Sequence, residues 1–472
     1  MRTNEVTTLE AAPVRSVNGG PREVLTLAWP AIVNMMSFTM LGLADTYFAG
    51  SIGTPEQGAV GFCSTLVWAE LCFFLGTLEL VQTFAAQSIG AGRPDRAARW
   101  GSAGLHLAVV FAVALLPTLA FARPVFEIVG IAPEMIPAAD SYFRIRVLGA
   151  VFFLLVHVGD GYYRGIGDTV TPMWIGVAAN ALNFALDWFL VIGVVAFGIP
   201  SFGVEGLAWA TVVATVVQAA VYWWIGRRRS QRGQPTPRYR DAFSREEARE
   251  LFRVGAPAGL HWLLEVSAWT AFTLAVARLD PVQSAANLIG ISLIRLSFMP
   301  GFGMSKAAAT LVGQYLGAKD IPSAFRSGWT STWLTCVYMV AAGIAYYVFR
   351  EPLVRLFTSD PEVIAVGAQL MAWAALFQLG DGVQLVVAGA LRGAGDTKFV
   401  MWASLTGAWG VFAPLSFTLM VVRKMGVEAG WIGVNAWVIV LALLLIWRFR
   451  SGVWTKGGIN LEPRPVPKAE VV

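Results

Sequence analysis

The feature that most constrains the fold is a series of long apolar runs that fills nearly the whole chain. A helix rises about 1.5 Å per residue, so about 20 apolar residues cross about 30 Å of hydrocarbon. About twelve runs meet that criterion. They cover Val24–Ala49, Gly58–Ala86, Trp100–Ala122, Ile136–Tyr163, Val170–Val194, Val204–Ile225, Leu251–Ala277, Ser284–Val312, Trp329–Phe349, Val363–Leu391, Phe399–Val422 and Val427–Trp447. With 56% hydrophobic and 14% charged residues, the chain is predicted to be an all-α polytopic membrane protein.

The net charge of +5 arises from basic loops and does not indicate a nucleic-acid partner. Basic residues gather after the second, sixth and eighth runs, in Arg93–Arg99, Arg227–Arg240 and Lys319–Arg326, whereas the opposite loops Gly50–Gln57 and Ala196–Gly203 contain no Lys or Arg. The positive-inside rule therefore places the basic loops and both termini in the cytoplasm, as in a multi-pass protein of the cell membrane. The first two dozen residues read as a cytoplasmic tail rather than a signal peptide.

Cysteine and histidine patterns favour neither a cofactor nor an enzyme. The cysteines lie in apolar runs without CxxC spacing and are interpreted as packing residues: Cys63, Cys72 and Cys336. The histidines stand singly, without HxxxH or HExxH spacing, and are interpreted as polar packing residues: His106, His157 and His261. We therefore expect no cofactor, no metal other than a transported Na⁺, and no catalytic residues.

The chain repeats itself at an offset of 227 to 228 residues. Leu27–Ala31 recurs as Val254–Ala258, Gln87–Ala91 as Gln314–Ala318, Arg164–Thr169 as Arg392–Thr397, and, after a small deletion, Gly203–Glu205 as Gly426–Glu428. Two six-helix copies have the same orientation, which predicts two lobes related by a pseudo-two-fold axis along the membrane normal.

The predicted organisation follows from this repeat. It comprises a tail (1–23), an N-lobe (24–226), a basic cytoplasmic linker (227–248), a C-lobe (249–449) and a second tail (450–472). Ser244 and Glu247 resemble a capping box at the start of the second lobe.

The repeated motifs themselves are predicted to serve structure and gating. In RGIGDT and RGAGDT, glycine lets helix ends approach closely, and Asp168 and Asp396 either cap the following helix or pair with the adjacent Arg164 and Arg392.

Two prolines, Pro30 and Pro257, occupy the first turns of equivalent helices. Either they form kinks that straighten on protonation, or they are tolerated near a helix start.

Charged residues within membrane spans are costly and mark candidate sites. In the N-lobe, Asp45, Asn183, Asp187 and Thr211 are predicted to lie at similar depth near the outer surface. Such oxygen ligands suit a hard monovalent cation, and two carboxylates desolvated together can also share a proton. The alternative is a hydrogen-bonded cluster that packs helices.

The C-lobe has no counterpart of Asp187 but carries Glu265 and Asp381 near mid-membrane, beside Arg295. These acids form either a second cation or substrate site or an internal ion pair with Arg295. Glu70 and Glu79 are further intramembrane acids that could shuttle protons or face the space between the lobes.

In their order and spacing, these motifs resemble those of the multidrug and toxic compound extrusion (MATE) family. The resemblance extends from Leu27 to about Trp447 of this chain. The resemblance rests on Pro30 with Asp45, QSIGAG (87–92), RGIGDT (164–169), NFALD (183–187), GVEGLAWAT (203–211), QYLGA (314–318) and FQLGDGVQLVVAGALRGAGDT (377–397). It implies a V-shaped twelve-helix antiporter that exports compounds by rocking its lobes. It further implies that Asp45, Asn183, Asp187 and Thr211 handle the coupling cation, and that Glu265 and Asp381 have a C-lobe cation role in one branch.

We therefore expect a monomer in the lipid bilayer that exports small organic compounds, of cationic amphipathic type, in exchange for inward H⁺ or Na⁺. The leading alternative is a lipid-linked precursor flippase of the same superfamily. A membrane-embedded enzyme and a passive channel are less favoured, because the intramembrane polar residues are mainly isolated acids and the lobes are asymmetric.

Overall fold

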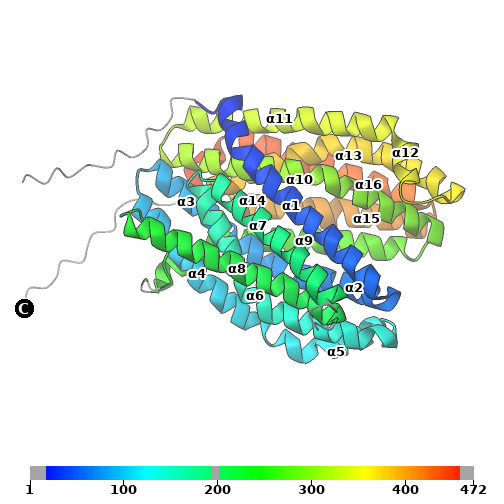
Figure 1. Ribbon diagram of the computed structural model, residues 1–472. Coiled ribbons are helices and arrows are strands. Elements are labelled where there is room, and N and C mark those ends of the chain that lie inside the picture. The colour runs from blue at the N-terminus through cyan, green and yellow to red at the C-terminus, as the bar shows by residue number, and fades with distance from the viewer. Residues whose placement is uncertain (1–17, 194–200, 240, 242, 458–472) are drawn as a thin grey trace, which may run out of the picture.

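The computed structural model describes residues 18–193, 201–239, 241 and 243–457. Most of both predicted tails and most of the loop Ala196–Gly203 lie outside the described residues. Every regular element in the described part is helical, and the elements form two groups, one from each half of the sequence (Figure 1).

The N-lobe contains six membrane-crossing segments, some of them made of two elements. They are α1 (Pro21–Ile52), α2 (Thr54–Leu78) with α3 (Leu80–Gly90), α4 (Pro94–Leu115), α6 (Ile136–Gly165), α7 (Val170–Asp187) with η2 (Trp188–Ile192), and α8 (Gly203–Gln231). Two short elements, α5 (Thr118–Val129) and η1 (Pro133–Met135), connect α4 to α6.

The C-lobe repeats this order. Its segments are α9 (Arg245–Val276), α10 (Pro281–Gly317), α11 (Ile321–Val348), α13 (Pro361–Ala394), the composite α14 (Thr397–Leu405), η4 (Thr406–Phe412), α15 (Ala413–Phe417) and η5 (Thr418–Val422), and α16 (Val427–Arg450). The short helices α12 (Arg350–Arg355) and η6 (Val453–Gly457) complete the described chain.

Eleven segments are long and apolar enough to cross a membrane, counting only the described residues. The twelfth, α9, has 32 residues but is less apolar, because it carries Arg253, His261 and Glu265. The all-α, twelve-helix, two-lobe prediction is confirmed.

Three of the predicted spans show the differences that matter most for the architecture. The run Gly58–Ala86 is divided at Glu79, where α2 ends and α3 begins. The third crossing starts earlier, at Pro94, and ends at Leu115 before the separate helix α5. The eleventh crossing includes two π-helical stretches, η4 and η5, which apolar composition does not distinguish from α-helix.

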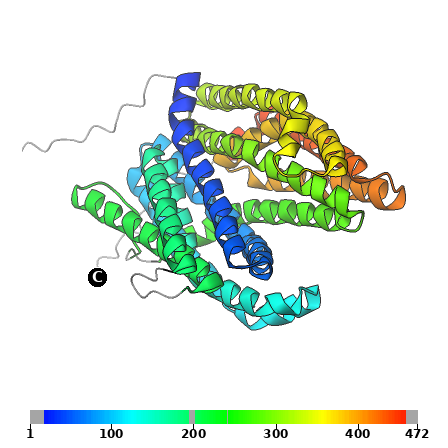
Figure 2. The same ribbon diagram turned by 45° about the vertical axis from the view of Figure 1, so that its right-hand side comes forward.

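The two lobes exchange the N-terminal parts of their first helices. Val24 and Ala28 of α1 are buried in the hydrophobic core of the C-lobe, whereas Leu251 and Ala258 of α9 are buried in that of the N-lobe. In Figure 1, α1 (blue) crosses obliquely in front of the other helices. We call the end where α8 finishes and α9 begins the linker end. Figure 2 shows the helices of the two lobes running apart toward the opposite end.

The prolines lie deeper in their helices than the sequence indicated. Because α1 begins at Pro21 and α9 at Arg245, Pro30 and Pro257 are interior residues rather than first-turn residues. The reason is that polar turns extend both helices beyond their apolar runs, and Ser244 caps α9 by accepting a hydrogen bond from the Glu247 backbone N–H at 3.2 Å. Each proline therefore removes a backbone hydrogen bond within its helix.

Candidate functional site

The lobes meet at the linker end through a close crossing of α3 and α10. A Cβ atom on Gly90 would lie 1.8 Å from the carbonyl oxygen of Gln314, and one on Gly317 would lie 2.0 Å from that of Gln87. Both distances are far below van der Waals contact, so only glycine permits this crossing. The two contacts are equivalent under the 227-residue repeat.

Reciprocal hydrogen bonds surround the crossing. The Nε2 atoms of Gln87 and Gln314 donate to the carbonyls of Gly393 and Gly165, both at 2.9 Å. The hydroxyls of Thr83 and Thr310 donate to the carbonyls of Arg392 and Arg164, at 2.9 and 3.1 Å. The repeated motifs of each lobe thus bind the motifs of the other, and together they close the linker end.

A buried ion pair lies on the same interface. Lys306 Nζ of α10 is 2.6 Å from Glu79 Oε1, and the side chains are 4% and 10% exposed. Lys306 follows Glu79 by 227 residues, so the two occupy equivalent positions in the repeat. A residue that contacts its own equivalent lies at the pseudo-two-fold axis, and here one position carries the acid and the other the base.

Two further C-lobe groups contact Glu79. Trp262 Nε1 donates to Glu79 Oε2 at 3.1 Å, and Arg392 Nε lies 3.6 Å from Oε1. Glu79 is therefore the acid of a structural ion pair rather than an open proton carrier. Lys306 is not predicted from its own apolar run, although the 227-residue offset relates it to Glu79.

The aspartates of the repeated RG-containing motifs do not pair with the adjacent arginines. Asp168 accepts from Thr171 N at 3.0 Å near the start of α7 and pairs with Arg229 at 2.5 Å. Asp396 pairs with Arg448 at 2.6 Å. Each aspartate thus connects to the last helix of its lobe, α8 or α16, because Arg164 and Arg392 turn inward and are buried.

The predicted N-lobe residues come together. Asp187 and Asn183 are buried on α7, and Asn183 faces Thr211 of α8. The amide orientation that gives both of its polar atoms a partner donates to Asp187 Oδ2 at 3.0 Å and accepts from Thr211 N at 3.0 Å. Asp45 of α1 is within hydrogen-bonding range of Asp187. Two adjoining carboxylates repel each other unless a proton or a cation lies between them. One oxygen of each, Oδ1, has no hydrogen-bond partner in the described structure.

Sequence reasoning missed Arg146 of α6, which lies near both carboxylates and packs over the Tyr142 ring at 5.8 Å. An arginine inside an apolar run is the signal that indicates it. Its positive charge offsets part of the repulsion between Asp45 and Asp187.

The C-lobe acids also approach each other, on α9 and α13. Glu265 Oε2 is 3.5 Å from His261 Nε2, and Asp381 Oδ1 accepts from Gln384 at 2.9 Å, whereas Asp381 Oδ2 has no partner in the described structure. Arg295 is exposed, and the described residues give it no ion pair with either acid. The alternative of an internal ion pair with Arg295 is therefore wrong, because this side chain projects from another face of α10.

The remaining singled-out residues occupy ordinary positions. Glu70 lines a small, mainly apolar cavity beside α5, and the cysteines are unpaired. His106 Nε2 contacts the Tyr239 carbonyl at 3.0 Å. No cluster of three or more His, Cys, Asp or Glu side chains suited to a metal ion occurs within the described residues.

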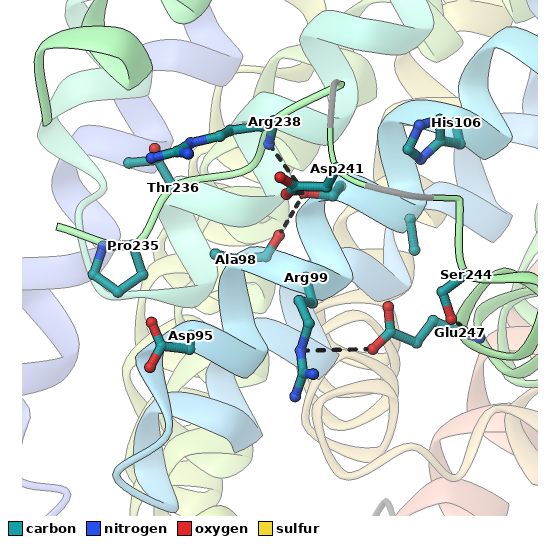
Figure 3. A pocket seen from close by; sticks show the side chains of 12 residues that line it. Asp95, Ala98, Arg99, His106, Pro235, Thr236, Arg238, Asp241, Ser244 and Glu247 are labelled. Carbon is teal, nitrogen blue, oxygen red and sulfur yellow. Dashed lines mark hydrogen bonds and ion pairs between the residues drawn. The ribbon is translucent and has the colours of Figure 1, made fainter. Parts of the chain in front are cut away.

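A cavity of about 630 Å³ lies beneath the linker and coincides with none of these acid sites (Figure 3). Its charges are largely satisfied: Asp241 accepts from Ser102 at 2.6 Å, and Arg99 lies 3.8 Å from Glu247. We regard it as packing space between the linker and α4.

Comparison with known proteins agrees with this architecture. The MatE family profile matches residues 30–189 and 257–418, one match in each lobe. The chain is 30% identical to a "Probable multidrug resistance protein NorM" of Thermotoga maritima, covering 94% of this chain and 95% of that protein. It is 31% identical to the protein of the same name from Deinococcus radiodurans, with 94% and 98% covered.

Solved structures share the fold. The eukaryotic MATE transporter AtDTX14 superposes with a TM-score of 0.85 at 18% identity, covering 92% of this chain and 96% of that one. A multidrug resistance MATE family transporter in an outward-facing conformation gives a TM-score of 0.84 at 21% identity, with 93% and 98% covered. The match of the family profile to both lobes and the near-complete alignment with relatives establish that the chain belongs to the MATE family of transporters.

Proposed function

We propose that the protein is a multidrug efflux antiporter that exports amphipathic organic compounds in exchange for inward H⁺ or Na⁺. The relatives named multidrug resistance proteins support the efflux part of this proposal. The observation that carries the antiport part is the contact between Asp45 and Asp187.

These two carboxylates supply a reason for cation dependence. Held together and largely desolvated, they cannot both remain ionised without a counter-charge, and Arg146 provides one positive charge for two negative ones. The remaining negative charge is neutralised by a proton shared between the carboxylates or by a Na⁺ bound to their oxygens together with Asn183 and Thr211. Glu265 and Asp381, two further buried acids on α9 and α13, are proposed as a second cation site in the C-lobe.

The transport cycle follows from thermodynamic linkage. Because the linker end is closed, a cation enters from the opposite end. We place the linker in the cytoplasm and propose that the protein acts as a monomer in the cell membrane. A cation and an organic compound that favour different arrangements of the lobes each promote release of the other. The ion gradient then drives export.

The test is efflux of ethidium from vesicles that contain the purified protein, under an imposed proton gradient and then under a sodium gradient. Asp187→Asn should abolish gradient-driven efflux, because the neutral amide removes the need for a cation. Asp360→Asn is the matched control, since Asp360 caps α13 at its exposed start and asparagine caps equally well.

The two gradients also distinguish the coupling ions. Efflux driven by one gradient, lost in Asp187→Asn and retained in Asp360→Asn, would support the antiport proposal and name the ion. Full gradient-driven efflux in Asp187→Asn would refute the assignment of the N-lobe site. Movement of labelled lipid headgroups without any drug efflux would favour a flippase instead.

A further inference from the structure

Helix α1 changes its packing partner along its length. Its first part packs in the C-lobe, because Val24 and Ala28 lie in that core and a Cβ atom on Gly303 of α10 would lie 2.8 Å from the Ile32 Cα atom. From Asn34 onward, α1 packs against α7 of the N-lobe (Figure 1). Separation of the lobes at the linker end therefore pulls the start of α1 away from α7.

The contact between α1 and α7 is polar from the N-lobe acids toward the linker end. On α7 the polar and small residues follow one another at spacings of four, three and four, which keeps them on one face of the helix. Their counterparts on α1 lie opposite them. We call the following residues the α1–α7 seam: Asn34, Ser37 and Asp45 of α1, and Gly176, Asn180, Asn183 and Asp187 of α7.

Direct contacts join the two sides of the seam. Asn180 Nδ2 donates to Ser37 Oγ at 2.6 Å. One turn nearer the linker end, a Cβ atom on Gly176 would lie 2.1 Å from Asn34 Oδ1, so only glycine lets this amide approach the α7 backbone. One turn nearer the opposite end, Asn183 belongs to the N-lobe site described above. The seam is thus closed in this arrangement of the lobes.

The seam supplies polar groups between the acids and the linker end. Asp187 and Gly176 are about 16 Å apart along the axis of α7, and residues three or four apart on a helix are neighbours on its surface. A cation that leaves two carboxylates through apolar packing would lose all of its ligands at once. Side-chain oxygens at successive turns, and water held between them, replace those ligands step by step.

We propose that the α1–α7 seam is the route by which the inward-moving cation leaves the N-lobe site, and that it opens only when the lobes separate at the linker end. This inference rests on the proposed antiport function and adds the step that joins lobe movement to cation release. As the start of α1 moves with the C-lobe, Asn34 leaves Gly176 first and Ser37 then leaves Asn180. Water enters the gap, and the cation passes along the exposed oxygens toward the linker.

The test replaces Asn180 by leucine, which has a similar size and no polar group. Two rates are measured with the full-length protein in vesicles: ethidium efflux driven by the ion gradient that drives the wild type, and exchange of radiolabelled ethidium without a gradient. Only the first rate requires cation release in every cycle. We expect Asn180→Leu to lower the ratio of efflux to exchange by about tenfold, the size of one lost hydrogen bond to a charged group. Asn180→Ser, which keeps a hydroxyl and leaves room for water, should restore most of the ratio.

The matched control is Asn287→Leu. Asn287 Oδ1 accepts from Trp431 Nε1 at 3.1 Å between α10 and α16, so this variant loses a buried hydrogen bond between helices that is not part of the seam. It should lower both rates by the same factor, because only the amount of folded protein changes. A lower ratio in Asn180→Leu alone would support the seam, whereas an unchanged ratio, or an equal fall in both variants, would overturn it. Exchange without gradient-driven efflux in the wild type would refute antiport itself, and the seam proposal with it.

A second measurement tests the separation of the seam. Ser37→Cys and Asn180→Cys are combined in a background without the native cysteines and joined by oxidation, which mass spectrometry verifies. The oxidised protein should lose both efflux and exchange, because the linker end can no longer open, and reduction should restore both. Full transport by the oxidised protein would overturn the proposal.

Discussion

Replacing Glu79 by Gln removes a buried carboxylate from contact with Lys306 at 2.6 Å and Arg392 at 3.6 Å. Both partners belong to the C-lobe, so the substitution leaves two cations without a counter-charge at the interface between the lobes. We predict that the linker end opens, because separation of the lobes lets Lys306 and Arg392 become hydrated.

The size of the effect follows from burial. Removing one partner of a buried ion pair costs about 3–5 kcal/mol. Gln keeps an oxygen that can accept from Trp262, so we take the lower value. At a factor of ten per 1.4 kcal/mol, about 3 kcal/mol shifts the ratio of closed to open molecules by about 100-fold.

The assay is a distance measurement by double electron–electron resonance between spin labels at residues 95 and 319. Asp95 and Lys319 are exposed, at the start of α4 and just after α10, on opposite lobes. The labels require a background in which Cys63, Cys72 and Cys336 are replaced by alanine. We expect one short distance in the wild type and an additional longer distance in Glu79→Gln.

The matched control is Glu351→Gln. Glu351 also lies 2.6 Å from an arginine, Arg355, but these side chains are 54% and 61% exposed, and exposed pairs contribute little. Glu79→Gln combined with Lys306→Met should restore much of the short distance, because it removes an unpaired charge. An unaltered distance distribution in Glu79→Gln would refute the view that this pair holds the linker end closed.

Two further predictions concern stability, measured as thermal unfolding of the purified protein. Gly90→Ala should lower the melting temperature and widen the linker end, because its Cβ would lie 1.8 Å from the Gln314 carbonyl. Gly226→Ala, in a helical position with open space, should be neutral or stabilising, and equal melting temperatures for the two variants would contradict the close crossing. Ser244→Ala should destabilise α9 by about 1 kcal/mol through loss of its cap, whereas Ser244→Asp should not; loss in both would point to another role for Ser244.

The sequence predicts the helices and the repeat well, since each depends on local composition or on matching motifs. It misses the one-residue division at Glu79, because the apolar run continues through that position without a Gly or Pro next to it that would mark an interruption. It misplaces the partners of Asp168 and Asp396 because Arg229 and Arg448 become neighbours only when each lobe closes on its last helix.

The N-lobe site was predictable because helix periodicity and depth place Asn183 and Asp187 on one face. Arg146 is not predicted, because only the packing of α6 against the other helices brings its side chain near Asp45 and Asp187.

The exchange of α1 and α9 between the lobes has a consequence for biosynthesis. Val24 and Ala28 emerge from the ribosome long before residues 268–454, which build the core that buries them. The first helix therefore cannot pack against its C-lobe partners until α10 and α11 have been inserted into the membrane. Conversely, a fragment that ends at Gln231 lacks Leu251 and Ala258, which complete the core of the first half. Neither half is complete as an isolated chain, but halves severed within 232–243 and produced together retain every inter-lobe contact described above and should assemble into one transporter.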